Sequence, residues 1–362
     1  MVKAVRLGKK EVSNFADPYI TVDCCSNHNG DMDLCKKMID AAVECGVDAV
    51  KFQAWGFDIF SRSCYSDDER QQELMDKSPV LKKLFTEIHP QLKQEMEEYQ
   101  LSKEQFREIK KYCDQKNITF FCTPLNKEWA DFLVDELKME IIKVASMDLN
   151  NYPFLAYLAK KGKPIILSTG MSSMTEILTA VETITKNGNN QIVILHCLSI
   201  YPTPPEITNL NNIDMLRDHF DFPIGFSYNS PGFTMPIAAV AKGACVIEQH
   251  FTIDKNLPGW DHKISAEPAD MKIVVEECRK VQKALGKYHR IISDAELQKR
   301  HHFRRSIIVT RDMKAGEVIT LNDIDYKRPG IGLEPEKNQF VIGRTLRRNL
   351  KEDDLISFDD LI

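Results

Sequence analysis

Two lysines lie inside short apolar runs that are typical of buried β-strands. Lys51 falls in DAVKFQ (48–53) and Lys143 in EIIKVAS (140–146). A buried ammonium group is unfavourable unless an anion compensates its charge. The two lysines therefore predict a site for a small phosphorylated or carboxylated anion, although both side chains could instead extend along their apolar stems to solvent.

The runs that carry these lysines are two of eight, and they alternate with amphipathic helical patterns. In one such pattern Leu34, Met38 and Ile39 fall on the same helix face. Eight strands, each followed by a helix, predict a (β/α)₈ TIM barrel. A doubly wound sheet would more often have about five or six strands and a glycine-rich nucleotide turn, which this chain lacks after its first run. The strand-like runs cover residues 19–24, 48–53, 118–123, 140–146, 164–170, 191–197, 223–229 and 245–251.

Residues 1–285 are expected to form the barrel domain, and the alternation of strand-like and helical patterns ends after it. The stretch 286–303 is expected to be a linker, and short strands broken by Gly and Pro turns indicate a small β-rich domain over 304–362. Within the barrel, residues 56–100 interrupt the alternation between the second strand and its helix. This interruption predicts one or two extra helices packed on the catalytic rim.

The composition of the 362 residues excludes several classes of protein. With 43% hydrophobic residues the chain is not intrinsically disordered, and no apolar run approaches the roughly 20 residues that span a bilayer. The 48 basic and 53 acidic residues are well mixed and give a net charge of −5, so neither nucleic acid nor membrane is an expected partner. The charged N-terminus lacks the apolar core of a signal peptide, which predicts a soluble cytoplasmic protein.

Ten cysteines are spread over predicted strands, helices and one loop-like stretch. No C-x-x-C pair occurs, and Cys24 and Cys25 are too close together to form a useful disulfide. We therefore expect buried thiols in a reducing compartment rather than a disulfide framework or a cysteine-based metal site.

In a TIM barrel the functional side chains lie at the carboxyl ends of the strands. Those ends carry mostly polar residues here. A small anion would therefore find hydroxyl and amide donors beside both ammonium groups. The polar residues at or just beyond these ends include Asp23, Gln53, Thr123, Ser146, Ser168, His196, Ser199, Tyr201, Ser227, Asn229, Glu248, Gln249 and His250.

Four long motifs follow one another along the chain. They are SNHNGDMDLCKKMIDAAVECGVDAVKFQ (26–53), STGMSS (168–173), LHCLSIYPTPPEITNL (195–210) and EQHFTIDKNLPGWDHKISAEP (248–268). Together they resemble the sialic acid (N-acetylneuraminate) synthase family. The C-terminal region, including KRPGIG (327–332), resembles the antifreeze-like SAF domain, a β-clip fold, that follows the barrel in that family. The resemblance covers nearly the whole chain.

This resemblance implies an enzyme that condenses phosphoenolpyruvate with an N-acylated amino sugar, N-acetylmannosamine or a related hexose. The products would be a nine-carbon sialic-type acid and free phosphate. The resemblance also implies a homodimer in which the C-terminal domain reaches the partner's barrel. Asp148 matches an acidic position near the sugar, yet it could instead cap the next helix. The implied phosphoenolpyruvate contacts are Lys51, Gln53, Thr123, Lys143, Ser146, Ser168 and Ser227, and the implied sugar contacts are Tyr201, Asp261 and Arg328.

In the family a divalent manganese or magnesium ion is held by two histidines, which implies a metal site at His250 and position 229. This chain has Asn229 in place of the second histidine, and an amide oxygen favours a hard, weakly held ion. The carboxylate of the first strand, usually glutamate in the family, is Asp23, which is shorter by one methylene. A displacement of about 1 Å can cost about 100-fold in rate. The resemblance implies Asp23, Lys51 and His250 as catalytic residues.

Two other functions remain open at this point. The departures at Asp23 and Asn229 are compatible with a catalytically impaired paralogue that binds sugars or regulates, although such a protein has no need of two buried lysines. Another synthase that condenses phosphoenolpyruvate with an aldose, of the spore-coat polysaccharide type, would share the scaffold. His28, in the loop after the first strand, is either an acid–base group or a structural residue.

Overall fold

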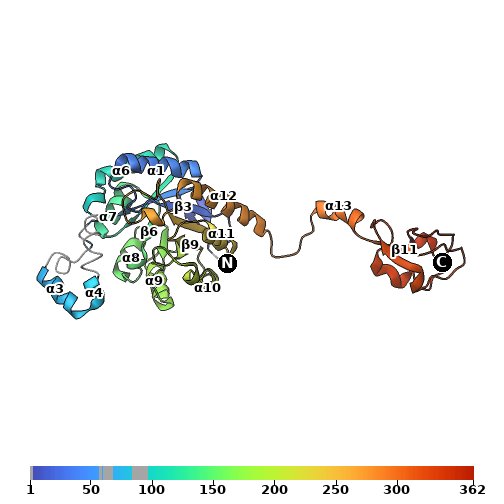
Figure 1. The fold of residues 1–362 in the computed structure, drawn as a ribbon. Helices are drawn as coiled ribbons and strands as arrows, with labels where there is room; N and C mark the ends of the chain where they lie inside the picture. The colour runs from blue at the N-terminus through green and yellow to red at the C-terminus, as the bar shows by residue number, and fades with distance from the viewer. Residues whose placement is uncertain (1–2, 57–58, 60–67, 84–96) are drawn as a thin grey trace. The chain divides into compact units, whose positions relative to one another are not determined.

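The computed structural model describes all residues except 1–2, 57–58, 60–67 and 84–96 (Figure 1). The chain forms two compact units, Met1–Gly286 and Lys287–Ile362. Each unit has a hydrophobic core of its own. The two units are therefore described separately.

The first unit is a closed barrel of eight parallel strands, which confirms the predicted TIM barrel. The last strand closes on the first, so that His250 lies opposite Asp23 in the register. All eight carboxyl ends therefore meet at one rim. The strands are β3 (Tyr19–Asp23), β4 (Ala49–Ala54), β5 (Thr119–Pro124), β6 (Ile142–Val144), β7 (Ile165–Ser168), β8 (Ile192–His196), β9 (Ile224–Tyr228) and β10 (Val246–His250).

Helices surround the barrel and bury their apolar faces against it (Figure 1). The helix α1 shows why these sequences fold as they do. Its N-terminus is capped by the side chain of Asp31, it buries Met38 and Ile39, and it ends at Gly46, whose φ of 76° suits glycine. The helices are α1 (Met32–Cys45), α6 (Lys103–Gln115), α7 (Lys127–Asp131), α8 (Tyr152–Ala159), α9 (Met174–Lys186), α10 (Asn211–His219), α11 (Thr234–Ala241) and α12 (Pro268–Leu285).

The interruption between β4 and α6 contains two further helices in its described part. They are α3 (Asp68–Lys77) and α4 (Pro79–Lys83). The helix α3 carries mostly charged and polar residues, whereas α4 combines three apolar residues with two lysines. Neither helix buries a described hydrophobic side chain. The expectation of extra helices over 56–100 falls partly on 57–58, 60–67 and 84–96, which lie outside the described residues.

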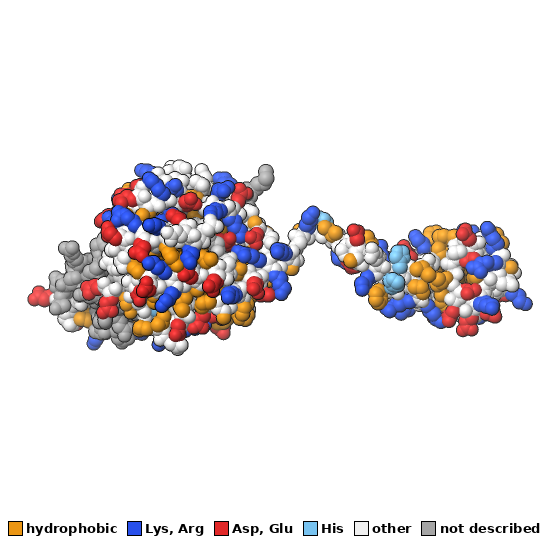
Figure 2. Space-filling model, turned by 90° about the horizontal axis from the view of Figure 1, so that it is seen from above, with side chains coloured by type: hydrophobic (Ala, Val, Ile, Leu, Met, Phe, Trp, Pro, Cys, Tyr) orange, Lys and Arg blue, Asp and Glu red, His pale blue; other side chains and the backbone are white. Residues whose placement is uncertain are grey.

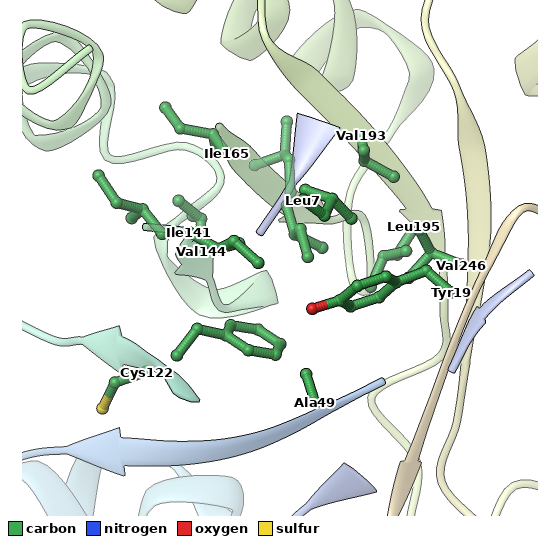
Figure 3. Close-up of a cluster of buried hydrophobic side chains, with 14 of the residues drawn as sticks. Leu7, Tyr19, Ala49, Cys122, Ile141, Val144, Ile165, Val193, Leu195 and Val246 are labelled. Atoms are coloured by element: carbon green, nitrogen blue, oxygen red, sulfur yellow. The ribbon is translucent and has the colours of Figure 1, made fainter. Parts of the chain in front are cut away.

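A short β-hairpin precedes the barrel, and the sequence did not reveal it. Its strands β1 (Val5–Leu7) and β2 (Lys10–Val12) are antiparallel and only three residues long. Leu7 is fully buried, and Figure 3 shows it pointing into the same hydrophobic cluster as Tyr19 and Val246. Tyr19 and Val246 stand at the amino ends of β3 and β10. The hairpin therefore fills the end of the barrel opposite the carboxyl ends of the strands.

Truncation of Leu7 to Ala is expected to reduce the free energy of unfolding of the first unit by about 2–5 kcal/mol, because the cavity cannot close. Urea unfolding followed by tryptophan fluorescence measures this, since all three tryptophans of the chain lie in the first unit. Glu11→Ala, at an exposed position of the same hairpin, is the control. Equal stability of the two variants would mean that the hairpin does not contribute to the core.

The barrel interior changes character from one end to the other. Tyr19 and Ala49 begin their strands in the hydrophobic cluster of Figure 3. Alternate residues of a strand point to the same side, so Asp23 follows Tyr19 inward, and Lys51 follows Ala49. Asp23 and Lys51 are both almost completely buried. The strands thus bring charged groups to the rim on top of an apolar base.

The second unit is small and contains little regular structure. Its two strands β11 (Ser306–Val309) and β12 (Ile324–Lys327) form an antiparallel sheet, and helix α13 (Asp294–Phe303) lies in the stretch that was expected to be a linker. Three 3₁₀ helices, Leu321–Asp323, Pro335–Phe340 and Phe358–Asp360, complete its short elements. The core residues are Ile307, Val309, Met313, Ile319, Ile324, Val341, Leu346, Leu350, Ile356 and Leu361.

Charges of both signs are interspersed over the face of each unit that Figure 2 shows. Among the described residues, no helix combines the length and the apolar character that crossing a membrane requires. The nine cysteines in the described ranges are free and buried, whereas Cys64 lies outside them.

Candidate active site

A cavity of about 420 Å³ opens at the carboxyl ends of the barrel strands. Twelve of the fourteen predicted site residues line it, contributed by all eight strands or by the loops that follow them. Glu248, which the sequence places at a strand end without a role, lines it as well, and Met147 and Trp260 are lining residues that the sequence missed. The predicted residues in the cavity are Asp23, Lys51, Gln53, Thr123, Lys143, Ser146, Ser168, Tyr201, Ser227, Asn229, His250 and Asp261.

A tight ion pair joins the first two strands of the site. The ammonium nitrogen of Lys51 lies 2.5 Å from Asp23 Oδ2, and both side chains are buried. Burial disfavours ionisation of Asp23, but Lys51 and the ring of His250 outweigh it and hold the pKa of Asp23 below its ordinary value. Burial also disfavours the charge on Lys51, yet Asp23 and Glu248 raise its pKa above the ordinary range. Both groups are therefore ionised at neutral pH.

Lys143 has a weaker set of partners. Its Nζ donates to Ser168 Oγ at 2.5 Å and to the carbonyl oxygen of Val144 at 3.1 Å, while the nearest carboxylate, Glu248, is 3.8 Å away. Burial lowers the pKa of Lys143, because Glu248 compensates only part of the desolvation and Lys51 opposes the charge. A bound anion would supply the missing compensation.

Glu248 connects the two lysines, and sequence reasoning did not single it out. Its Oε1 lies 3.4 Å from Lys51 Nζ and accepts a hydrogen bond from Ser227 at 3.0 Å, while Oε2 has no hydrogen-bond partner among the described residues. A usable signal was present in the sequence. Glu248 precedes His250 by two positions on one strand, so both side chains point to the same side.

The expected metal position lies beside this charged group. His250 Nε2 is 3.7 Å from Asp23 Oδ2, and His250 Nδ1 is buried without a hydrogen-bond partner among the described residues. Asn229 donates its amide N–H to the carbonyl oxygen of Leu198 at 2.6 Å. Potential ligand atoms of Asp23, Cys25 and His250 lie within 4.8 Å of one another. An imidazole, a carboxylate and a thiol that lie this close together are donor types that fit a divalent ion.

Two side chains from the sugar-site prediction flank His250. The ring of Tyr201 lies 5.8 Å from the ring of His250. Burial raises the pKa of Asp261 above its ordinary value, although the nearby His250 opposes this shift. Tyr201 and Asp261 come from the loops after β8 and β10, so the metal position and the predicted sugar contacts share one side of the cavity.

Two predicted residues do not line the cavity. Asp148 ends a short 3₁₀ helix, and its carboxylate accepts a hydrogen bond from Asn151 at 3.2 Å. Asn151, not Asp148, is the N-cap residue of α8, which disfavours the capping alternative. Arg328 belongs to the second unit, where its guanidinium lies over the ring of Phe303 at 5.3 Å. The sugar-binding roles of Asp148 and Arg328 remain predictions.

His28 lies beneath the rim rather than in the cavity. It is fully buried, its Nδ1 accepts the backbone N–H of Gly30 at 3.1 Å, and its ring stacks on Trp55 with centroids 6.3 Å apart. Burial lowers the pKa of His28 to about 4. A neutral imidazole that holds a loop favours the structural alternative over an acid–base role.

The first unit is therefore expected to lose about 3 kcal/mol of stability as the pH falls from 6.5 to 4, because the unfolded chain protonates His28 before the folded chain does. This stability is fully present above pH 6.5. Urea unfolding at several pH values, compared between the natural chain and His28→Gln, measures the contribution. His219→Gln, at an exposed position of α10, is the control. An identical pH dependence in the natural chain and His28→Gln would contradict it.

Comparisons with known proteins agree with this architecture. The N,N′-diacetyllegionaminic acid synthase of Campylobacter jejuni is 36% identical over 332 residues, which cover 91% of this chain and 96% of the relative. The crystal structure of the N-acetylneuraminic acid synthetase of Leptospira borgpetersenii has a TM-score of 0.69 at 32% identity, over 83% of this chain and 95% of that one. The crystal structure of the Bacillus subtilis spore coat polysaccharide biosynthesis protein SpsE has a TM-score of 0.64 at 32% identity, over 99% of both chains.

Family models divide the chain at nearly the same place as the structure does. The model of the NeuB family matches residues 38–290, and the model of the SAF domain matches residues 304–362. The NeuB match covers more than half of the chain and includes seven of the eight barrel strands. The chain belongs to the NeuB family and carries a C-terminal SAF domain.

Proposed function

We propose that this protein condenses phosphoenolpyruvate with an N-acylated amino sugar to a nine-carbon sialic-type acid and releases phosphate. The observation that carries the proposal is the pair of buried lysines at the rim, of which Lys143 lacks a close carboxylate. A trianion such as phosphoenolpyruvate has the charge that these groups need. The names of the legionaminic acid and N-acetylneuraminic acid synthases among its relatives support the same chemistry.

The reaction forms one carbon–carbon bond and breaks one carbon–oxygen bond. C3 of phosphoenolpyruvate attacks the aldehyde carbon of the open-chain sugar, and the aldehyde oxygen takes up a proton to become a hydroxyl. Water adds to C2 and loses a proton. The resulting intermediate then expels phosphate and leaves the 2-keto acid. No oxidant or reductant is required.

The charged residues of the cavity have different roles in the proposed reaction. Lys51 and Lys143 hold the phosphate and carboxylate oxygens, with hydroxyl groups such as that of Ser168 as further donors. Asp23 is ionised and paired with Lys51, so it holds this ammonium group in place in the cavity and does not donate a proton. His250 would hold a divalent ion, which would supply Lewis-acid polarisation of a carbonyl oxygen.

The proposed active protein is a homodimer in which the second unit completes the partner's site. Its surface offers apolar side chains for such a contact, because Phe340, Phe358 and Ile362 are 48–64% exposed. They line a hollow of about 410 Å³ together with Lys337 and Arg344. The contact of Arg328 with the sugar is part of this proposal.

Phosphate release from phosphoenolpyruvate with a panel of N-acylated hexoses tests the function. The panel includes N-acetylmannosamine and the diacetylated hexoses that lead to legionaminic and pseudaminic acids, each with and without a chelator. We expect sugar-dependent phosphate release with one member of the panel. Binding of phosphoenolpyruvate without turnover of any sugar would instead support the catalytically impaired paralogue. Failure to bind phosphoenolpyruvate would contradict both functions.

A further inference from the structure

Cys25 adopts a backbone conformation that favours glycine. Its φ is +44°, in the left-handed region where a β-carbon is strained. The side chain is nonetheless completely buried, two residues beyond Asp23 at the carboxyl end of β3. A strained backbone position is often found where a side chain has a functional role, so the groups that surround the thiol indicate its role.

The thiol belongs to the polar side of the barrel rim. Its sulfur is one of three potential ligand atoms, with those of Asp23 and His250, that lie within 4.8 Å of one another. The backbone N–H of Cys25 donates to Asp23 Oδ1 at 3.0 Å, which fixes the turn that brings the thiol back over the strand. The neighbouring Cys24 is different, because it packs in the hydrophobic core.

His250 approaches the same point from the adjacent strand. It is paired with Asp23 in the register of β10 and β3, and its side chain is only 9% exposed. Its Nδ1 has no hydrogen-bond partner among the described residues, and its Nε2 faces Asp23. A buried imidazole that lacks partners is suited to accept a cation.

We propose that Cys25, His250 and Asp23 bind one divalent transition-metal ion, and that the thiolate of Cys25 takes the place of the histidine that Asn229 replaces. Asp23 can also take part, because a carboxylate has about four acceptor positions, of which Lys51 and Gln53 use Oδ2 and the backbone N–H of Cys25 uses Oδ1. The proposal deepens the proposed function by naming the class of ion that its site takes.

The thiolate changes which ion the site prefers. With Asn229 and His250 alone, a hard and weakly held ion such as magnesium is expected. A set of thiolate, imidazole and carboxylate instead favours borderline ions such as zinc, cobalt or ferrous iron, and it binds them more tightly. The site is thereby distinguished from one that uses the amide oxygen.

Titration of the metal-free full-length chain with Co²⁺ tests this directly. We expect one ion per chain and a thiolate-to-cobalt charge-transfer band in the near ultraviolet. Cys25→Gly should lose the band and at least about 100-fold in affinity, since even loss of an outer-shell partner costs about 10- to 100-fold. This variant should fold, because glycine suits the positive φ. Cys24→Ala, which changes the adjacent buried thiol, should keep both the band and the affinity.

A second measurement guards against indirect effects. Co²⁺ or Zn²⁺ should raise the melting temperature of the natural chain and of Cys24→Ala but not that of Cys25→Gly. The double variant Cys25→Gly/Asn229→His should recover affinity without the thiolate band. Cobalt binding without such a band in the natural chain, or unchanged affinity in Cys25→Gly, would overturn the proposal. Because these readouts do not require turnover, a positive result stands even if no sugar in the panel releases phosphate.

Discussion

Replacement of Lys143 by Met is expected to weaken phosphoenolpyruvate binding by about 10- to 100-fold, which corresponds to the roughly 1.5–3 kcal/mol of a lost charged hydrogen bond. The same change should leave the free energy of unfolding unchanged or slightly higher. The reason is that burial already lowers the pKa of Lys143, so the empty site carries an ammonium that is not fully compensated. Isothermal calorimetry and urea unfolding measure the two quantities.

Lys51→Met should behave differently, although it removes the same charge. Lys51 is the 2.5 Å partner of Asp23 and also lies 3.4 Å from Glu248, so its loss leaves two buried carboxylates poorly compensated. We expect about 3–5 kcal/mol of destabilisation in addition to weaker binding of the anion. Lys51 is thus expected to stabilise the site in the absence of substrate, whereas Lys143 is expected to contribute mainly to substrate binding.

Lys160→Met, at an exposed position at the end of α8, is the matched control for both variants. It should change neither binding nor stability. Unchanged affinity for phosphoenolpyruvate in Lys143→Met would mean that Lys143 is structural. Equal destabilisation of the Lys143→Met and Lys51→Met variants would contradict the assignment of their different partners.

The sequence allowed the barrel to be predicted because its strands combine β-branched residues with a regular spacing. Each of the eight predicted runs overlaps an observed strand, and the polar residues at their ends converge because parallel strands share one rim. Eleven of the twelve predicted residues that line the cavity were therefore predictable from topology. Asp261, which lies in the loop after β10, was predicted only from the family resemblance, and Asp148 does not line the cavity.

The features that sequence reasoning missed depend on three-dimensional packing. The hairpin β1–β2 has three-residue strands, which are too short to give a period, and only its contacts with the barrel end reveal its purpose. The conformation of Cys25 is likewise invisible in the sequence, because cysteine, unlike glycine or asparagine, does not indicate a positive φ. The helix α7 continues as a π-helix over Phe132–Glu136, which no local pattern signals.

The second large effect is expected on the KM for the sugar when Arg328, the proposed sugar contact, is replaced. Arg328→Ala should raise the KM for the sugar by about 10- to 100-fold, because a charged hydrogen bond is lost, while calorimetry should show unchanged binding of phosphoenolpyruvate. Arg347→Ala, at another exposed position of the second unit, is the control and should leave both quantities unchanged. A loss of phosphoenolpyruvate binding in Arg328→Ala would contradict a role confined to the sugar.

Co-expression of two defective chains then decides whether Arg328 acts on its own barrel or on the partner's. One chain carries Lys143→Met and the other Arg328→Ala, so neither homodimer has a complete site. If Arg328 acts across the dimer, each mixed dimer has one complete site, formed by the barrel of the Arg328→Ala chain and the Arg328 of its partner. Equal mixing makes half of the dimers mixed, so about one quarter of the natural rate should return. If Arg328 acts on its own barrel, every barrel in the mixture still lacks one of the two groups, and mixing should restore no activity.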